Sequence, residues 1–235
     1  MRRLRFAILL LLAIRAASAE EPYRVLVPSG DAPHPAVLLV PGCSGFSAVN
    51  GINLYEERAN ELQTAGYLVV FVDYLGRFGD CAHTSHAQAA EKLLDAAAWV
   101  RAQPGTDPHS ISVIGWSYGG GAVLATLSSR PPVFAKAVLY YPDCRAEQPW
   151  SAAAASVLML LGGNDDVALP ALCDLVVQGA PANSVRVIVY PNAHHGFDAR
   201  SRPEPVRYPF GTVGYDAEAA AASWAATLEF LRQSG

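Results

Sequence analysis

The segment VIGWSYGGG at residues 113–121 places Ser117 between Gly115 and Gly119. An apolar run precedes this serine and a helix-compatible run follows it, so the pattern predicts a turn between a buried strand and a helix. The two glycines leave room for a sharp bend that a Cβ would block, and a helix N-terminus behind the serine favours developing negative charge. This G-x-S-x-G pattern is typical of a nucleophile elbow. The alternative is a glycine-rich turn that serves packing alone.

Strand-like and helix-like segments alternate through most of the chain. The apolar run at 36–42 ends in Pro-Gly, as a buried parallel strand would, and 85–103 has amphipathic helical spacing. This order predicts a mostly parallel central sheet with helices on both faces, with functional loops at the carboxyl ends of the strands. The longest irregular segment, expected at 198–213, is a candidate border of the site. The predicted strands are 23–28, 36–42, 67–74, 111–117, 135–142, 156–163 and 184–191, and the predicted helices are 52–66, 85–103, 118–130, 168–178 and 214–233.

Length and charge narrow the class of protein. The chain has 235 residues, of which 51% are hydrophobic, and no linker-like segment divides it. We therefore expect one α/β domain over residues 20–235. The net charge of −4 without a basic stripe argues against a nucleic-acid partner. Nothing in the sequence indicates the oligomeric state.

The first 19 residues have the pattern of a secretory signal peptide. A basic MRRLR precedes an apolar run at 6–14, and small residues follow at 17–19. The apolar run is shorter than the ~20 residues that a membrane-spanning helix needs. We therefore expect cleavage near Ala19 and an exported protein, periplasmic or secreted, without stable membrane insertion. Arg15 is atypical for such a segment, and the alternative is an uncleaved membrane anchor.

Four cysteines, Cys43, Cys81, Cys144 and Cys173, fit an exported protein with two disulfides. Cys144 and Cys173 follow strand ends that should be neighbours, which favours that pair. Cys43 and Cys81 would then join two loops of the active site. Free buried thiols are the alternative. Neither the cysteines nor the histidines have metal-ligand spacing, so we expect no metal or other cofactor.

A serine nucleophile needs a base and a group that orients the base. The segment VYPNAHHGF at 189–197 offers His194 and His195, and LLGGNDDV at 160–167 offers Asp165 and Asp166. Both segments follow predicted strands, and the order Ser, Asp, His is that of α/β-hydrolases. Only one of two neighbouring residues can face Ser117, and the other of each pair is then a loop residue.

The remaining candidates would bind the oxyanion or the substrate. Two backbone amides should hold the oxyanion, and we expect them at Tyr118, after the nucleophile, and at Cys43, in the loop after the strand at 36–42. Arg77 could bind a substrate carboxylate, or be a surface arginine. Trp116 could line the acyl pocket, or belong to the core.

Several motifs together resemble the dienelactone hydrolase family of α/β-hydrolases. They are VPGCSGF, DYLGRFGDC, GWSYGG, YYPDC, GGNDDVALP and AHHGF, and the resemblance spans about 36–232. It implies an α/β-hydrolase fold, with Asp165 as the acid and His195 as the base. The namesake enzymes carry a cysteine at the elbow where this chain has Ser117, so the resemblance implies ester hydrolysis of some kind and leaves lactone specificity open.

The sequence therefore predicts an exported serine hydrolase acting on a small ester or lactone. Ser117 is the predicted nucleophile, His195 the base and Asp165 the orienting acid. Two alternatives stay open: an acyltransferase or small peptidase on the same triad, and an exported binding protein that kept the fold.

Overall fold

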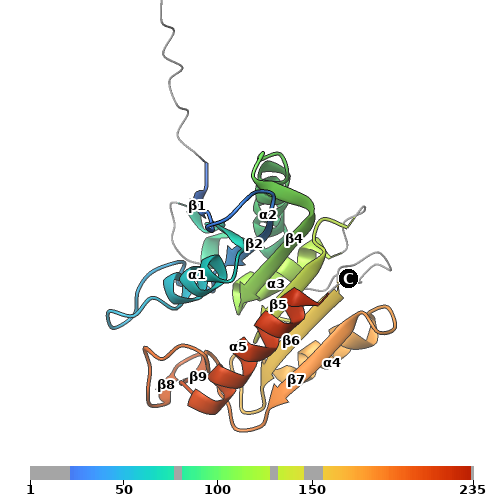
Figure 1. Ribbon diagram of the computed structural model, residues 1–235. Helices are drawn as coiled ribbons and strands as arrows, with labels where there is room; N and C mark the ends of the chain where they lie inside the picture. Colours follow the sequence, from blue (N-terminus) through green and yellow to red (C-terminus); the bar gives the residue numbers. More distant parts are fainter. Residues whose placement is uncertain (1–21, 77–80, 128–131, 146–155, 234–235) are drawn as a thin grey trace, which may run out of the picture.

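The computed structural model describes residues 22–76, 81–127, 132–145 and 156–233. A seven-stranded sheet forms the centre, in the spatial order β1-β3-β2-β4-β5-β6-β7 (Figure 1). The first strand runs antiparallel to β3, and every other neighbouring pair is parallel. The strands are β1 (Arg24–Leu26), β2 (His34–Val40), β3 (Leu68–Phe71), β4 (Thr106–Trp116), β5 (Lys136–Tyr140), β6 (Ser156–Gly162) and β7 (Val185–Tyr190).

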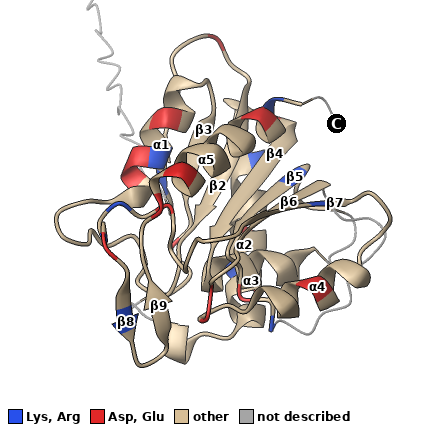
Figure 2. Cartoon of the chain, turned by 90° about the horizontal axis from the view of Figure 1, so that it is seen from below, with Lys and Arg blue, Asp and Glu red and all other residues tan. Residues whose placement is uncertain are grey.

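Helices cover both faces of this sheet (Figure 2). Alternate residues of β2 point to opposite faces: Leu38 packs in one core with α2, α3 and α4, and Leu39 packs in the other with α1 and α5. The helices are α1 (Leu54–Thr64), α2 (His86–Arg101), α3 (Tyr118–Thr126), α4 (Pro170–Gln178) and α5 (Ala217–Arg232). The predicted mostly parallel α/β architecture is confirmed.

Local sequence explains where the helices begin and end. Asn53 accepts hydrogen bonds from the first amides of α1, and Ser85 forms a reciprocal capping box with Gln88 at the start of α2. Gly66 follows α1 with a φ of 93°, which a glycine adopts without strain.

None of the helices in the described ranges is both long and apolar enough to cross a membrane.

The structure differs from the predicted elements in the 198–213 segment. That segment was expected to be irregular, but it contains a short antiparallel hairpin of β8 (Val206–Tyr208) and β9 (Gly211–Val213). The exposed Asp166 holds the hairpin, because its carboxylate accepts a hydrogen bond from the Thr212 amide at 2.6 Å and pairs with Arg207. The end of the helix predicted at 118–130 falls outside the described residues.

Both predicted disulfides are present. Cys43 is bonded to Cys81, and Cys144 is bonded to Cys173. The first joins the loop after β2 to a short 3₁₀ turn at Cys81–His83 that precedes α2. The second joins the segment after β5 to α4. Each bridge therefore fixes a loop at the carboxyl end of the sheet.

Candidate active site

Ser117 occupies a sharp turn between β4 and α3. Its φ of 52° and ψ of −120° lie outside the ordinary regions for a residue with a Cβ. Hydrogen bonds on both sides hold this conformation: the Ser117 amide donates to the Tyr140 carbonyl at 2.9 Å, and its carbonyl accepts from the Asp143 amide at 2.9 Å. Backbone strain of this kind persists only where the surroundings determine it, and it is typical of functional positions.

The glycines of the elbow are required by close backbone contacts. A Cβ on Gly119 would lie 2.3 Å from the Pro41 carbonyl oxygen, and one on Gly115 would lie 2.8 Å from the Gly119 carbonyl oxygen. No side chain fits at such distances. The missing side chains therefore let the start of α3 pack directly on the loop that follows β2.

Ser117, His195 and Asp165 lie in one hydrogen-bonded row. His195 Nε2 is 2.9 Å from Ser117 Oγ, and His195 Nδ1 is 2.8 Å from Asp165 Oδ2. The other carboxylate oxygen of Asp165 accepts the backbone amides of Val167 and Ala168 at 2.9 and 2.8 Å. Since the carboxylate can only accept from Nδ1–H, Nε2 is left to accept the serine proton. The three residues come from the carboxyl ends of β4, β6 and β7.

The neighbouring candidates point elsewhere. His194 is partly exposed, and its Nδ1 lies 3.1 Å from the Asn164 carbonyl oxygen. Asp166 is exposed and bonds to the β8–β9 hairpin. The structure thus brings His195 and Asp165 to Ser117, but neither His194 nor Asp166.

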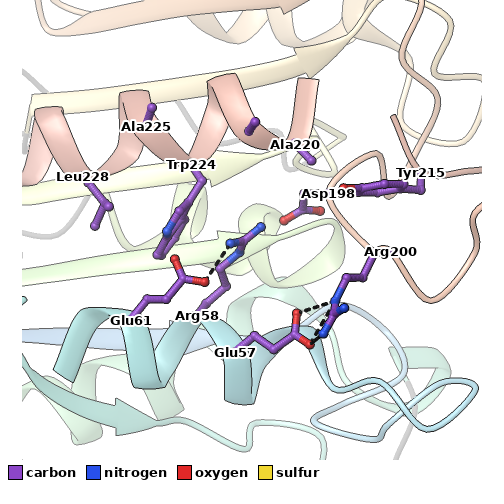
Figure 3. A pocket seen from close by; sticks show the side chains of 11 residues that line it. Glu57, Arg58, Glu61, Asp198, Arg200, Tyr215, Ala220, Trp224, Ala225 and Leu228 are labelled. Atoms are coloured by element: carbon purple, nitrogen blue, oxygen red, sulfur yellow. Dashed lines mark hydrogen bonds and ion pairs between the residues drawn. The ribbon is translucent and has the colours of Figure 1, made fainter. Parts of the chain in front are cut away.

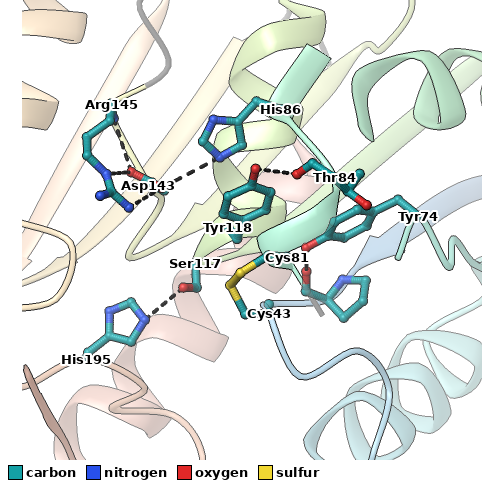
Figure 4. Close-up of a disulfide and its surroundings, with 12 residues drawn as sticks. Cys43, Tyr74, Cys81, Thr84, His86, Ser117, Tyr118, Asp143, Arg145 and His195 are labelled. Carbon is teal, nitrogen blue, oxygen red and sulfur yellow. Dashed lines mark hydrogen bonds and ion pairs between the residues drawn. A yellow bond between two sulfur atoms is a disulfide. The ribbon is translucent and has the colours of Figure 1, made fainter. Parts of the chain in front are cut away.

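The loop after β2, where an oxyanion-binding amide was predicted, lies against Ser117. A Cβ on Gly42 would be 3.4 Å from Ser117 Cβ, and the Gly42 amide donates to the Tyr55 hydroxyl at 2.9 Å. The Tyr74 hydroxyl donates to the Pro41 carbonyl at 2.9 Å (Figure 4). The disulfide to Cys81 holds Cys43, two residues further along the same loop.

The two amides expected to bind the oxyanion lie on this loop and on α3. Tyr118 is the first residue of α3, and the first amides of a helix have no partner within it. Its amide follows Ser117 directly, and the Cys43 amide follows Gly42. Both amides thus belong to backbone next to Ser117, and their role in binding an oxyanion stays a prediction.

Of the two expected substrate contacts, Trp116 is not at the surface. It is 1% exposed, its ring is 5.4 Å from that of Tyr140, and its Nε1 donates to Asp198 at 3.0 Å. The core role is the one that the structure supports, because β4 turns this residue towards the face that α1 and α5 cover. Arg77 falls outside the described residues.

A second polar cluster lies beside the elbow on α2 and after β5. Arg145 forms a two-pronged ion pair with Asp143, and His86 Nε2 lies 3.7 Å from the same carboxylate (Figure 4). Burial lowers the pKa of His86, although the Asp143 charge opposes that shift. The His86 ring packs 4.1 Å from that of Tyr118, whose hydroxyl donates to the Thr84 carbonyl.

Sequence reasoning missed Asp198 entirely. This carboxylate is 2% exposed and lies three residues beyond His195. Burial raises its pKa, whereas hydrogen bonds from Tyr141 and Trp116 and the nearby Arg58 charge act in the opposite direction. The sequence offered only an acidic residue directly after Phe197.

Known structures share this fold and its topology. The dienelactone hydrolase of Anabaena variabilis superposes with a TM-score of 0.67 at 20% identity, covering 90% of this chain and 91% of that one. A butyrate-bound thermophilic esterase of Thermogutta terrifontis gives a TM-score of 0.67 at 16% identity, covering 89% and 87%. The sheet, its helices and the elbow define an α/β-hydrolase fold.

The family follows from the sequence match. Residues 23–235 match the dienelactone hydrolase family, and the chain belongs to it. An uncharacterised protein of Mycobacterium tuberculosis is 27% identical over 184 residues, which cover 68% of this chain and 63% of that protein. The chain thus matches less than two thirds of the length of that relative.

Proposed function

We propose that this protein is an exported serine hydrolase that cleaves a carboxylic ester or a related acyl bond. The observation that carries the proposal is the unbroken row from Ser117 Oγ through His195 to Asp165, with distances of 2.9 and 2.8 Å, behind a strained elbow. A hydroxyl is a weak nucleophile unless a base lies within hydrogen-bond reach, and this geometry supplies the base.

In the acylation step Ser117 Oγ attacks the ester carbonyl while His195 Nε2 takes its proton. Asp165 holds the imidazole in the tautomer with Nδ1–H and stabilises its positive charge. The amides of Tyr118 and Cys43 bind the oxyanion of the tetrahedral intermediate. The protonated imidazole then gives its proton to the departing alcohol, which leaves an acyl-serine.

In the second step a water attacks the acyl-serine. His195 removes a proton from that water, and the second tetrahedral intermediate collapses to release the acid and restore Ser117 Oγ–H. The described residues thus supply every proton transfer that the cycle requires.

Two features support export. Both cysteine pairs are oxidised in the structure, and disulfides persist mainly in oxidising compartments. Residues 1–19 have the composition of a signal peptide. Amino-terminal sequencing of the protein recovered from the cell envelope or medium tests this part. A start near Glu20 is expected, and a retained Met1 would contradict cleavage.

A fluorophosphonate tests the nucleophile without any assumption about the substrate. We expect one adduct, mapped by peptide mass spectrometry to Ser117, and loss of the adduct in Ser117→Ala and His195→Ala. His194→Ala is the matched control, because this partly exposed neighbour lies outside the row. Folded wild-type protein that forms no adduct would contradict the proposal and favour a binding protein.

Product analysis separates hydrolysis from transfer. An ester substrate incubated with a large excess of an alcohol should give mainly the free acid. Predominant formation of the new ester would instead assign an acyltransferase to the same triad, and cleavage of peptides but not esters would assign a peptidase.

A further inference from the structure

Asp198 is a buried carboxylate with two side-chain hydrogen bonds. Its Oδ1 accepts from the Tyr141 hydroxyl at 2.6 Å, and its Oδ2 accepts from Trp116 Nε1 at 3.0 Å. Both donors are themselves buried, at 5% and 1% exposure. Burying a carboxylate is costly unless it is hydrogen-bonded, so the contacts that this group makes need a reason in the structure.

Each donor to Asp198 is next to a member of the catalytic row. Trp116 directly precedes Ser117, so a fixed indole fixes the last residue of β4 before the elbow. The Tyr141 ring packs against the imidazole of His195, with ring centroids 4.7 Å apart and an interplanar angle of 60°. A shift of either aromatic ring would therefore be felt at the nucleophile or at the base.

The network reaches the oxyanion loop as well. Tyr55 packs edge-on against Trp116 with centroids 5.2 Å apart, and its hydroxyl accepts the Gly42 amide at 2.9 Å. Tyr55 is partly buried, and burial and the Asp198 charge both raise the pKa of its hydroxyl. One carboxylate thus lies beneath three parts of the site, and its side-chain hydrogen bonds go to Trp116 and Tyr141 rather than to Ser117 itself.

The surroundings of Asp198 are also compatible with an alternative, purely structural role. It lies at a groove of about 750 Å³ between α1 and α5 (Figure 3), where Arg58 lies over the Trp224 ring at 4.5 Å and pairs with Glu61 at 3.3 Å. The Arg58 charge favours the ionised form of Asp198. If Asp198 only compensated the positive charge of Arg58, removing it would change the stability of the fold and leave the rate of the chemical step unchanged.

We propose that Asp198 is a positioning residue for the proposed reaction: through Trp116 and Tyr141 its carboxylate sets the relative placement of Ser117 and His195. The inference rests on the proposed function, because it concerns the geometry of the same row. A displacement of about 1 Å in a reacting group can cost about 100-fold in rate. We therefore expect Asp198→Ala to lower kcat by about 10-fold to 100-fold with KM within about twofold.

The experiment compares kcat, KM and the fluorophosphonate labelling rate with the melting temperature. Asp198→Asn keeps the shape and an acceptor for Trp116, and its amide can donate to the Tyr141 hydroxyl, so it should recover most of the activity lost in Asp198→Ala. Asp216→Ala is the control for stability, because Asp216 caps α5 through the Ala219 amide at 2.9 Å and lies outside the network. The control should lower the melting temperature and leave kcat and labelling unchanged.

Each outcome assigns a cause. Suppose that the wild type labels at Ser117 and that Asp198→Ala labels and turns over at the same rate. This result would overturn the positioning role and leave the proposed function standing. Equal losses in the alanine and asparagine variants would assign the effect to charge and also overturn it. Wild type that does not label would overturn the proposed function itself.

A milder variant keeps the test valid if Asp198→Ala does not fold. Tyr141→Phe retains the ring against His195 and removes only the hydroxyl that donates to Asp198. We expect a severalfold decrease in kcat with unchanged KM. An unchanged kcat in this folded variant would count against the proposal.

Discussion

Gly119→Ala should damage both stability and activity, because the new methyl group would meet backbone rather than flexible side chains. The added Cβ would lie 2.3 Å from the Pro41 carbonyl oxygen and 2.5 Å from that of Val40. Both atoms belong to the end of β2 and the loop that follows it. Relief of the contact therefore requires α3 and this loop to move apart.

The magnitude follows from two opposing contributions. Overpacking of a well-packed site costs about 1–3 kcal/mol, and contacts with backbone belong at the upper end of that range. Alanine in place of glycine within a helix returns at most about 1 kcal/mol. The net loss is about 2 kcal/mol, which for a domain of this size lowers the melting temperature by about 4–8 °C. The same movement separates the Cys43 amide from Ser117, so kcat should fall as well.

Gly105→Ala is the matched control, because no atom lies within 4 Å of the Cβ that it would add. Thermal unfolding followed by circular dichroism, with ester turnover measured on the same samples, compares the two variants. The control should stay within about 0.5 kcal/mol of wild type. If Gly119→Ala melts and turns over like the control, the close packing of α3 on the loop after β2 is wrong.

Three further changes test other parts of the molecule. Asp165→Asn should lower kcat by about 10⁴-fold, because an amide orients the wrong imidazole tautomer, and a loss below tenfold in an ester assay would contradict its role. Replacing Cys144 and Cys173 with serine opens a loop with a sequence separation of 29. The free energy of unfolding in urea should fall by about 3–4 kcal/mol, and an unchanged midpoint would contradict this. Burial opposes ionisation of Asp143, but hydrogen bonds from Arg145 hold the pKa of Asp143 below its usual value. This stabilisation, about 1 kcal/mol or less, is present above the unfolded pKa and lost as pH falls through the folded pKa. The difference in unfolding free energy between wild type and Asp143→Asn should therefore shrink from pH ~5 to pH ~3, and a constant difference would refute it.

The sheet and the loops that carry Ser117, the two histidines and the two aspartates were accessible from sequence because their signals are local, whereas the choice of His195 and Asp165 within each pair came from the resemblance to the family. Each strand is a short apolar run that ends in a polar or glycine-rich loop, and parallel strands bring those loops to one edge. The fold was confirmed on this basis. Pairing of the cysteines was also predictable, since Cys144 and Cys173 follow elements that lie side by side.

The β8–β9 hairpin and the Asp198 network could not be predicted in this way. The hairpin has three residues in each strand, and its tie to Asp166 crosses more than 40 positions of sequence. The hydrogen bond between Trp116 and Asp198 spans 82 positions. Such contacts depend on how loops pack over the sheet, which no local periodicity records. The burial of Trp116 was the more accessible part, because Ile114 two residues earlier shares its face.

The disulfide of Cys43 bears on the presence of oxygen rather than sulfur at position 117. Gly42, the residue before Cys43, is in van der Waals reach of the elbow, so the bridge lies beside the nucleophile. A thiolate there would stand next to an oxidised sulfur pair and could attack it, forming a mixed disulfide and releasing the Cys81 thiol. An alkoxide has no such exchange partner. With oxygen at this position, the covalent brace on the loop after β2 is compatible with the nucleophile that we propose at Ser117.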